Sequence, residues 1–421
     1  MAYVTQRKTG TELNRPYEAD LPVHEWYRFV LSYPPHLVRD YLERFHVRPG
    51  MRVLDPYCGT GTTLVECKKH GVESVGIEPN AVVHMAATVK TDWTPDPDDL
   101  EGDAERIADE ASRRLLAWQG EPAVLEDDPA RLLIKNSISP LPLHKALVLR
   151  DAIRDVGHPG LRGHEELALA KQLVFSFSNL RFGPEVGVSR KRKHDVDAVA
   201  LWLEAVRGMA ADLRGLGHAG PETRALRGDA RYACSLLEPE SVDAVITSPP
   251  YPNEKDYTRT TRLESVVLGF LSDRADLRAM KHDLMRSNTR NIYKGDSDGD
   301  WVADNDRVMD LADRIEARRL ELGKTSGFEK MYHKVVRNYF GGMARHLSSL
   351  RGALKPGAQL AYVVGDQASF FRILIRTGQI LGEIGTDLGY RLDGIDLFRE
   401  RVSTVTGDML REEAVLFTWG G

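Results

Sequence analysis

A glycine-rich stretch at residues 53–63, VLDPYCGTGTT, restricts the possible folds more than any other part of this chain. It joins residues 51–55, which are typical of a short buried strand, to residues 62–70, which are typical of a helix. Residues 74–78 predict a second strand, and another helix is expected from about Ala81. Alternation of strand and helix implies a parallel sheet, so the predicted fold class is α/β.

This alternation is interrupted twice. Residues 98–217 have apolar positions three and four apart and are expected to be mostly helical. The strand pattern resumes at residues 243–247. Residues 254–326 are rich in charge and glycine, and KGDSDGDW at 294–301 predicts a loop.

The last hundred residues return to the core pattern, with a long helix at 329–354, a strand at 359–364 and a closing pair of strands near 394–398 and 414–419. We therefore expect one core that carries two insertions. The expected parts are residues 1–97, 218–253 and 327–421 for the core, and 98–217 and 254–326 for the insertions.

Charge is distributed unevenly along the 421 residues, whose formal net charge is −5. Residues 92–130 contain 13 acidic and 3 basic side chains, which leaves a net charge of about +5 for the rest. We interpret the acidic stretch as a solvated helical face. A nucleic-acid partner requires local positive potential rather than a basic total, so this balance does not exclude one.

Other compositional features favour a protein of the cytoplasm. The chain has no run of about 18 apolar residues that could span a membrane, and residues 1–20 lack the apolar segment of a signal peptide. The cysteines Cys58, Cys67 and Cys234 form no Cys-x-x-Cys pair, so neither a disulfide framework nor a cysteine zinc site is expected. The scattered histidines show no ligand spacing, and no metal is expected.

The glycine-rich stretch is compatible with a small ligand at the start of a helix, because glycines let a ligand approach the backbone. A dinucleotide site would require a third glycine, but Gly61 is followed by Thr-Thr-Leu. A phosphate-binding loop would require a lysine, which is also missing.

A second distinctive run, VITSPPYPN, occupies residues 245–253. The apolar strand pattern ends in Ser-Pro-Pro-Tyr, and proline restricts both its own backbone and that of the residue before it. Such a turn would hold one hydroxyl, one carbonyl and one aromatic face at the end of a strand. These groups are suited to binding a planar base that carries an amino group.

Together, DPYCGTGTT and SPPY resemble the signatures of the DNA amino-methyltransferases, with Tyr57 where that family usually has phenylalanine. The resemblance extends to residues 24–27 and 32–35 before the first strand, to residues 253–257 and 261–264, and to YVVGD at 362–366. It implies a Rossmann-like methyltransferase fold, a seven-stranded mostly parallel sheet with a closing antiparallel strand. It also implies S-adenosylmethionine as the cofactor.

By this resemblance, Asp55, Gly59 and Gly61 line the methionine part of the cofactor, and Glu78 binds the ribose hydroxyls. Asp229 would meet the adenine amine, although a helix N-cap is the alternative for that residue. Cys58 is expected to serve packing only. The complete set of implied cofactor residues is Tyr33, Pro34, Asp55, Pro56, Tyr57, Gly59, Gly61, Thr62, Glu78, Pro79, Asp229 and Ala230.

The implied reaction is direct methyl transfer to an exocyclic amine of an extruded base. The Oγ of Ser248 and the carbonyl of Pro249 would accept the two amine hydrogens, Pro250 would stiffen the turn, and Tyr251 would stack on the base. The family resemblance associates Ser-Pro-Pro-Tyr with cytosine N4. Methylation of cytosine carbon 5 would require a cysteine nucleophile, and none of the cysteines follows a proline.

Double-stranded DNA is the expected partner, with a cognate restriction nuclease as a further one. We expect no recognition domain after the last strands, so the insertions would contact DNA. The basic run at 181–193 predicts a phosphate-binding loop, and a solvated charge run is the alternative. The candidate contacts are Arg181, Arg190, Lys191, Arg192, Lys193, Arg259 and Arg262, with Arg286 and Arg290 as weaker ones. Alternatives for the whole protein are an adenine-N6 DNA or RNA methyltransferase and a silent cofactor-binding subunit.

Overall fold

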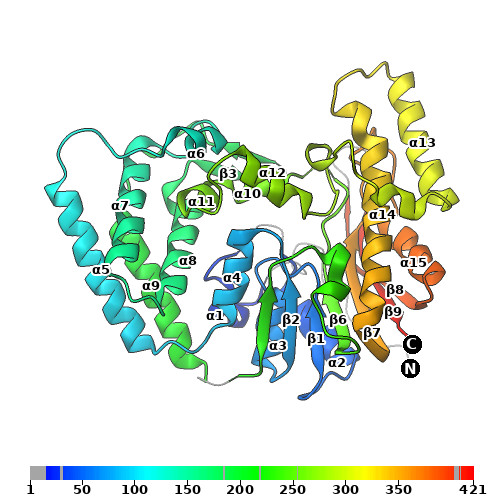
Figure 1. Ribbon diagram of the computed structural model, residues 1–421, viewed down its shortest axis with the longest axis horizontal. Coiled ribbons are helices and arrows are strands. Elements are labelled where there is room, and N and C mark those ends of the chain that lie inside the picture. The colour runs from blue at the N-terminus through cyan, green and yellow to red at the C-terminus, as the bar shows by residue number, and fades with distance from the viewer. Residues whose placement is uncertain are drawn as a thin grey trace.

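A seven-stranded sheet forms the centre of the molecule (Figure 1). The computed structural model describes residues 16–28, 32–183, 185–217, 220–253, 255–402, 407 and 409–421. The strands are β1 (Arg52–Asp55), β2 (Glu73–Ile77), β5 (Thr223–Leu226), β6 (Val242–Thr247), β7 (Leu354–Gly365), β8 (Arg391–Val402) and β9 (Met409–Thr418), in the order β5-β2-β1-β6-β7-β9-β8.

The first five strands in this order pair in parallel, whereas β9 pairs antiparallel with both β7 and β8. The predicted mostly parallel seven-stranded sheet with its antiparallel closing strand is therefore confirmed. The strand order reverses between β1 and β6, because β1 leads to β2 and β5 on one side while β6 leads to β7 on the other. Open α/β sheets bind their ligands beyond the carboxyl ends of the strands at such a point.

Helices cover both faces of this sheet. On one face, α2 (Pro35–Arg44) packs Leu37, Val38 and Tyr41 against alternate residues of β1, β6, β7 and β9. On the other face lie α14 (Tyr332–Leu350) and α15 (Thr377–Asp387), which enclose the second set of alternate strand residues. Further core helices are α1 (Leu21–His24), α3 (Thr62–Lys69) and α4 (Ala81–Thr91).

The first insertion forms a helical lobe on the left of Figure 1. It consists of α5 (Pro97–Ala117), α6 (Asp127–Leu132), α7 (Pro140–Val156), α8 (Arg162–Gln172) and α9 (Ala198–Gly215). Most acidic side chains of α5 lie on an exposed face, where Glu101 and Glu105 pair with Arg207 of α9, whereas Asp103 is buried and accepts a hydrogen bond from the backbone N–H of His158. The interpretation of this stretch as a solvated helical face is confirmed.

The basic run at 181–193 is not simply a loop, as the sequence suggested. It contains a short antiparallel hairpin of β3 (Leu180–Phe182) and β4 (Val186–Val188), in which Leu180 lies opposite Val188. The glycines and the proline of this run predicted a loop. The residues on either side of them pair as antiparallel strands, which these turn residues did not indicate.

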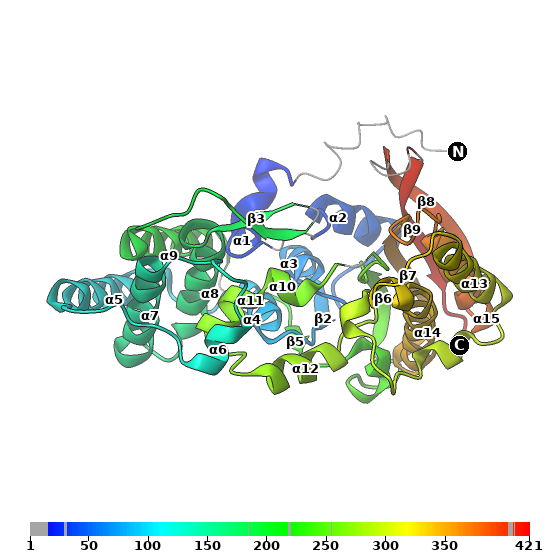
Figure 2. The ribbon, with the colours of Figure 1, turned by 90° about the horizontal axis from the view of Figure 1, so that it is seen from above.

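The second insertion is more helical than its composition indicated. It contains α10 (Tyr257–Thr260), α11 (Arg262–Val267), α12 (Arg274–His282) and α13 (Asp306–Glu321), and a 3-10 turn, η6 (Asp298–Val302), ends the predicted loop at 294–301. In Figures 1 and 2, α10, α11 and α12 lie between the helical lobe and α14. None of the helices in the described ranges is both long and apolar enough to span a bilayer.

Candidate active site

Asp55, the last residue of β1, is the polar centre of the predicted cofactor loop, and its side chain is fully buried. Its Oδ1 accepts hydrogen bonds from Thr247 Oγ1 at 2.6 Å and from the Tyr57 backbone N–H at 3.1 Å. Its Oδ2 accepts from Thr63 Oγ1 at 2.8 Å and from the Tyr33 hydroxyl at 3.0 Å. Burial raises the pKa of Asp55, and these donors oppose that rise by stabilising the charged form.

The loop after β1 needs glycine at two positions. Gly59 and Gly61 have φ angles of +50° and +82°, which residues with a side chain rarely adopt. A Cβ on Gly61 would lie 3.2 Å from the Cα of Ala87, so the glycine also permits close packing on α4. A Cβ on Gly59 would meet no atom within 4 Å, which leaves open space beside the backbone. Cys58 is buried and packs on Leu64, as predicted.

Glu78 follows β2 and lies beside the same loop. Its Oε1 accepts a hydrogen bond from the backbone N–H of Asn80 at 2.8 Å, and the backbone N–H of Gly59 also stabilises its charged form. Burial raises the pKa of Glu78 to about 7. The backbone after β2, including the half-buried Pro79, thus places an acidic group against the glycine loop.

The Ser-Pro-Pro-Tyr turn begins directly after β6, the strand next to β1. Ser248 Oγ donates its hydrogen to the carbonyl oxygen of Val363 on β7, at 3.1 Å. Pro249 is buried, and Pro250 is half-buried. Because Thr247 contacts Asp55, the turn and the cofactor loop lie at neighbouring strand ends.

Tyr251 lies over β7 at the point where that strand carries Gly365. A Cβ on Gly365 would lie 2.9 Å from the Cε2 of Tyr251, so this glycine leaves room for the ring. The backbone N–H of Tyr251 donates to the hydroxyl of Tyr257 at 3.4 Å. Burial raises the pKa of Tyr251, so the phenol is neutral near neutral pH.

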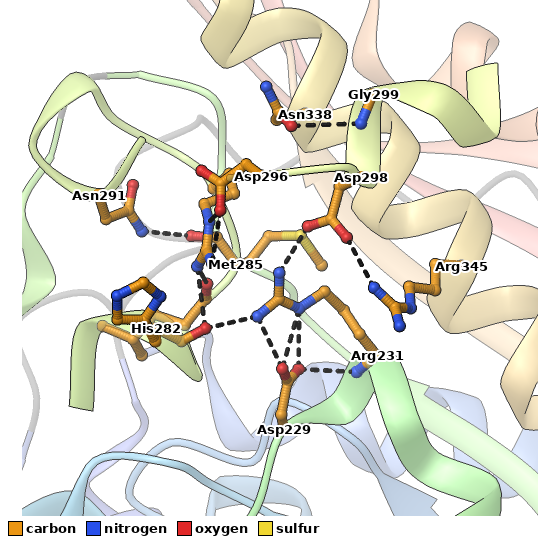
Figure 3. Close-up of polar contacts among 12 residues, drawn as sticks. Asp229, Arg231, His282, Met285, Asn291, Asp296, Asp298, Gly299, Asn338 and Arg345 are labelled. Atoms are coloured by element: carbon orange, nitrogen blue, oxygen red, sulfur yellow. Dashed lines mark hydrogen bonds and ion pairs between the residues drawn. The ribbon is translucent and has the colours of Figure 1, made fainter. Parts of the chain in front are cut away.

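Asp229 is held by Arg231, as Figure 3 shows. Its Oδ1 accepts from the Arg231 backbone N–H at 2.9 Å, which is the N-cap arrangement that the sequence left open, at the start of η4 (Ala230–Ser235). The buried guanidinium of Arg231 also reaches Asp229 Oδ2 at 2.7 Å, Asp298 Oδ2 at 2.5 Å and the His282 carbonyl oxygen at 2.7 Å. Arg231 thus joins the predicted adenine-binding segment to α12 and η6 of the second insertion.

His346 of α14 forms another contact across this region. One ring nitrogen lies 2.8 Å from the carbonyl oxygen of Ala230, and the other lies 2.7 Å from the hydroxyl of Tyr362 on β7. Burial lowers the pKa of His346 to about 4, so the ring is neutral and can donate to one partner and accept from the other. The Tyr57 ring lies edge-on to His346, with 5.1 Å between ring centroids.

The residues before β1 divide into two groups. Tyr33 contacts both Asp55 and Thr63, and the neighbouring Pro34 is buried. By contrast, Trp26 Nε1 donates to Asp212 at 2.7 Å and the Tyr27 hydroxyl to Glu264 at 2.5 Å, so these aromatics join the N-terminal segment to α9 and α11.

The structure therefore brings together the residues predicted for the cofactor loop and the turn. Pro56 and Thr62 are buried in the loop around Asp55. The sequence alone did not indicate that Thr63, Thr247, Arg231 and His346 belong to this region. Thr63 and Thr247 lie inside the quoted motifs, but their shared contact with Asp55 depends on the pairing of β1 with β6.

The predicted DNA contacts differ in how far they are exposed to solvent. Arg181, Arg190, Lys191 and Arg192 are exposed on and after the β3–β4 hairpin. Lys193 is also exposed, but its Nζ lies 2.5 Å from the carbonyl oxygen of Ser176.

The arginines of the second insertion are less accessible than expected. Arg259 is half-buried, and Arg290 is exposed with its guanidinium over the Phe328 ring. Arg262 is buried and donates to Thr258 at 2.8 Å. Arg286 is also buried, and it pairs with Asp296 at 3.0 Å. The donors of Arg286, a candidate base or phosphate contact, thus already have partners inside the protein.

Comparisons with known proteins agree with this geometry. The family model for N6/N4 methyltransferases, described as DNA methylase, matches residues 5–88. The Type II methyltransferase M.BsoBI of Geobacillus stearothermophilus is 22% identical over 424 residues, which cover 90% of this chain and 81% of the relative. The Type II methyltransferase M.AvaI of Nostoc sp. is 22% identical over 418 residues, which cover 89% of this chain and 80% of the relative.

Two further similarities cover less than half of the other protein. The Type II methyltransferase M.MjaII of Methanocaldococcus jannaschii is 37% identical over 68 residues, which are 16% of this chain and 13% of the relative. The crystal structure of TrmN from Thermus thermophilus aligns with 91% of this chain and 48% of that chain, at 13% identity and a TM-score of 0.29, too low to support a fold assignment.

The matched family model includes the glycine loop around Asp55, and the two long relatives extend through the segment that contains Ser248. Methyltransferases of this kind in general use S-adenosylmethionine and act on DNA. On the combined grounds of sheet topology, site geometry and sequence similarity, this chain is similar to the methyltransferases of the N6/N4 DNA methylase family.

Proposed function

We propose that this protein transfers a methyl group from S-adenosylmethionine to the exocyclic N4 amine of cytosine in a specific sequence of double-stranded DNA. The observation that supports this proposal most strongly is the hydrogen bond from Ser248 Oγ to the carbonyl oxygen of Val363. A hydroxyl has one hydrogen and two lone pairs. The hydrogen of Ser248 is directed to Val363, and Tyr251 also hydrogen-bonds this hydroxyl, so Oγ keeps one lone pair that can accept a hydrogen from a base amine.

The residues beside the glycine loop have the chemistry that the cofactor requires. Glu78 can accept hydrogen bonds from both hydroxyls of a ribose, and the open space beside Gly59 allows a ligand to approach the backbone. Asp229 retains lone pairs for an adenine amine while it is paired with Arg231. When bound, S-adenosylmethionine would supply an electrophilic methyl group on a sulfonium.

The turn would prepare the base for attack. In cytosine, the lone pair of the amine is delocalised into the ring, and two acceptors in fixed directions favour a more tetrahedral nitrogen. Ser248 Oγ and the Pro249 carbonyl would be those acceptors, while Tyr251 would stack on the extruded base and contribute ~1–3 kcal/mol. The amine nitrogen would then attack the methyl carbon directly while the carbon–sulfur bond breaks and the sulfur leaves as a neutral thioether, and the methylated amine would release one proton to solvent.

Cytosine N4 is the preferred target because serine occupies the first position of the motif. An adenine-N6 DNA or RNA methyltransferase has the same requirements apart from base shape, and a silent subunit would bind the cofactor without transfer. A tritiated-methyl transfer assay with purified protein, mixed-sequence duplex DNA and RNA separates these possibilities. Nucleoside mass spectrometry of the product would identify N4-methylcytosine, and exclusive N6-methyladenine or label only in RNA would overturn the proposal.

A further inference from the structure

A basic pocket lies between α6, α11 and α12, which are neighbours in both Figure 1 and Figure 2. Its volume is about 310 Å³, and none of the residues that line it is acidic. The lining residues are Arg131, Leu132, Arg262, Arg274, Leu277, Arg278, Lys281 and Tyr293. Five cationic side chains from three helices therefore surround one hollow.

Two of these cations have no charge partner among the residues that the structure describes. Arg274 and Arg278 form no ion pair with any residue in the described ranges, although Arg278 lies 5.7 Å from the centre of the Tyr293 ring. They lie four residues apart on α12, and Lys281 follows three residues later, so all three share one helical face.

Of the remaining three cations, Arg262 bonds to neutral groups, whereas Lys281 and Arg131 are already ion-paired. Arg262 is buried and donates to neutral oxygens of Thr258 and Leu132 rather than to carboxylates. Lys281 pairs with Asp256 at 2.9 Å, and Arg131 pairs with Asp127 and Asp128 near the exposed edge.

Like charges that converge in a hollow repel one another, and a bound anion removes that cost. Guanidinium groups match the oxygens of phosphate in a bidentate arrangement, and the exposed Arg274 and Arg278 can adjust to such a ligand. A neighbouring hollow shares Arg131 and Arg274 but is also lined by Asp128 and Asp273, so it is less suited to an anion.

The pocket is connected to the candidate active site through the chain that follows the turn. Lys281 pairs with Asp256, the next residue is Tyr257, and the Tyr257 hydroxyl accepts the hydrogen bond from the backbone N–H of Tyr251. The backbone N–H of Asn253, two residues after Tyr251, donates to the carbonyl oxygen of Ser287 at 3.2 Å. Ser287 follows α12 in the chain. A DNA strand whose base stacked on Tyr251 would therefore pass close to α12.

We propose that this basic pocket binds backbone phosphates of the DNA strand that carries the target base. The inference rests on the proposed function, because it takes DNA as the partner, but it concerns affinity rather than chemistry. Each phosphate contact releases counterions, so the contacts should appear in the salt dependence of DNA binding.

The test measures fluorescence anisotropy of a labelled mixed-sequence duplex with the full-length protein, at salt concentrations from ~50 to ~200 mM. The variant Arg274→Gln/Arg278→Gln should lower the slope of log K against log salt by about 2, since each lost phosphate contact lowers it by about 1. The control Arg207→Gln/Arg214→Gln removes the same charge from exposed ion pairs on α9 and should leave the slope unchanged. A single Arg274→Glu variant, at the exposed start of α12, provides an independent measurement.

A slope equal to that of the unmodified protein in both α12 variants would overturn the inference. A free phosphate ion could occupy the same pocket. A second experiment therefore measures the shift in melting temperature of the protein when inorganic phosphate is added. A phosphate-induced shift that needs Arg274 and Arg278, with an unaltered DNA slope, would assign the pocket to a free anion and also overturn it. Loss of the slope together with methylation that survives Ser248→Ala would instead overturn the catalytic proposal alone.

Discussion

Thr247 Oγ1 donates a hydrogen bond of 2.6 Å to Oδ1 of Asp55, although the two residues are 192 positions apart in the chain. The bond joins the end of β6 to the end of β1, where the strand order of the sheet reverses. Ser248 follows Thr247 directly, so the predicted catalytic turn is positioned by the same carboxylate that organises the cofactor loop. This geometry makes Asp55 a link between two sites that the sequence presents separately.

Thr247→Val should weaken this link without a large change in shape. It leaves one oxygen of a buried carboxylate with one donor fewer, and we expect the free energy of unfolding to fall by about 1–3 kcal/mol. Calorimetry with S-adenosylhomocysteine should show weaker binding. The control Thr386→Val removes a hydroxyl that bonds only to Gly382 within α15, and should cost less and leave binding intact. Equal effects of the two variants would contradict this role.

Ser248→Ala and Tyr251→Ala should each lose methyl transfer while S-adenosylhomocysteine binding survives. Removal of the preorganised acceptor should lower kcat by about 10²-fold or more. Loss of the ring should lower kcat/KM by about 5- to 150-fold, which corresponds to ~1–3 kcal/mol of stacking. Tyr251→Phe retains the ring and serves as the control. A Ser248→Ala/Tyr251→Ala double variant with normal single-turnover rates would refute the proposed roles.

Cofactor affinity should depend on pH through Glu78. Burial raises the pKa of this carboxyl to about 7. Above that value the group is ionised and accepts hydrogen bonds from both ribose hydroxyls; below it, the group carries a proton and loses acceptor capacity. The affinity for S-adenosylhomocysteine should therefore fall as pH decreases through ~7, by at most tenfold per pH unit. Calorimetry across this range checks the slope. Glu78→Gln should bind weakly, without the slope, and a parent protein with constant affinity would contradict the assignment.

Arg231→Met should strongly destabilise the protein. It leaves the buried Asp298 and the partly buried Asp229 without their main cationic partner, and breaking a buried ion pair typically costs ~3–5 kcal/mol. Arg345, at 3.3 Å from Asp298, can compensate only in part. Denaturant unfolding measures the change, with the exposed Arg207→Met as a control that is expected to cost much less. A similar cost for both variants would show that the network in Figure 3 adds little stability.

Glu165 should make the protein less stable as pH rises. It is fully buried in the helical lobe, its carboxyl oxygens have no hydrogen-bond partner in the described ranges, and burial raises its pKa from 4.5 to about 8. Between these values the folded state holds a proton that the unfolded state releases, so the free energy of unfolding falls by up to ~1.4 kcal/mol per pH unit. Glu165→Gln should remove this slope in pH-dependent denaturation curves, whereas Glu166→Gln, which alters an ion pair with Arg154, should retain it. Parallel curves for the parent and Glu165→Gln would exclude the effect.

Much of the core could be predicted because its signals lie within short stretches of chain. The strand, glycine loop and helix around Asp55 were located to within one or two residues, since backbone preferences and hydrophobic periodicity act locally. Strand β6, the long helix α14 and the antiparallel pair β8–β9 were also found in this way. The short β5 and the β3–β4 hairpin were missed, because a strand of three or four residues has too little periodicity to distinguish it from a loop.

The sequence by itself determined which residue types stand at the two motifs, and therefore the chemistry available: a left-handed glycine loop, an acid after the second strand and a proline-stiffened hydroxyl. Only the tertiary structure decided which of these groups meet and which arginines remain accessible. Arg231 and Arg286 are buried with partners 67 and 10 residues away, whereas Arg274 and Arg278 lie beside a hollow and form no ion pair within the described part of the chain. The physical reason is that the free energy of a charged side chain depends on the surface and charges packed around it, and chain folding assembles these from distant segments.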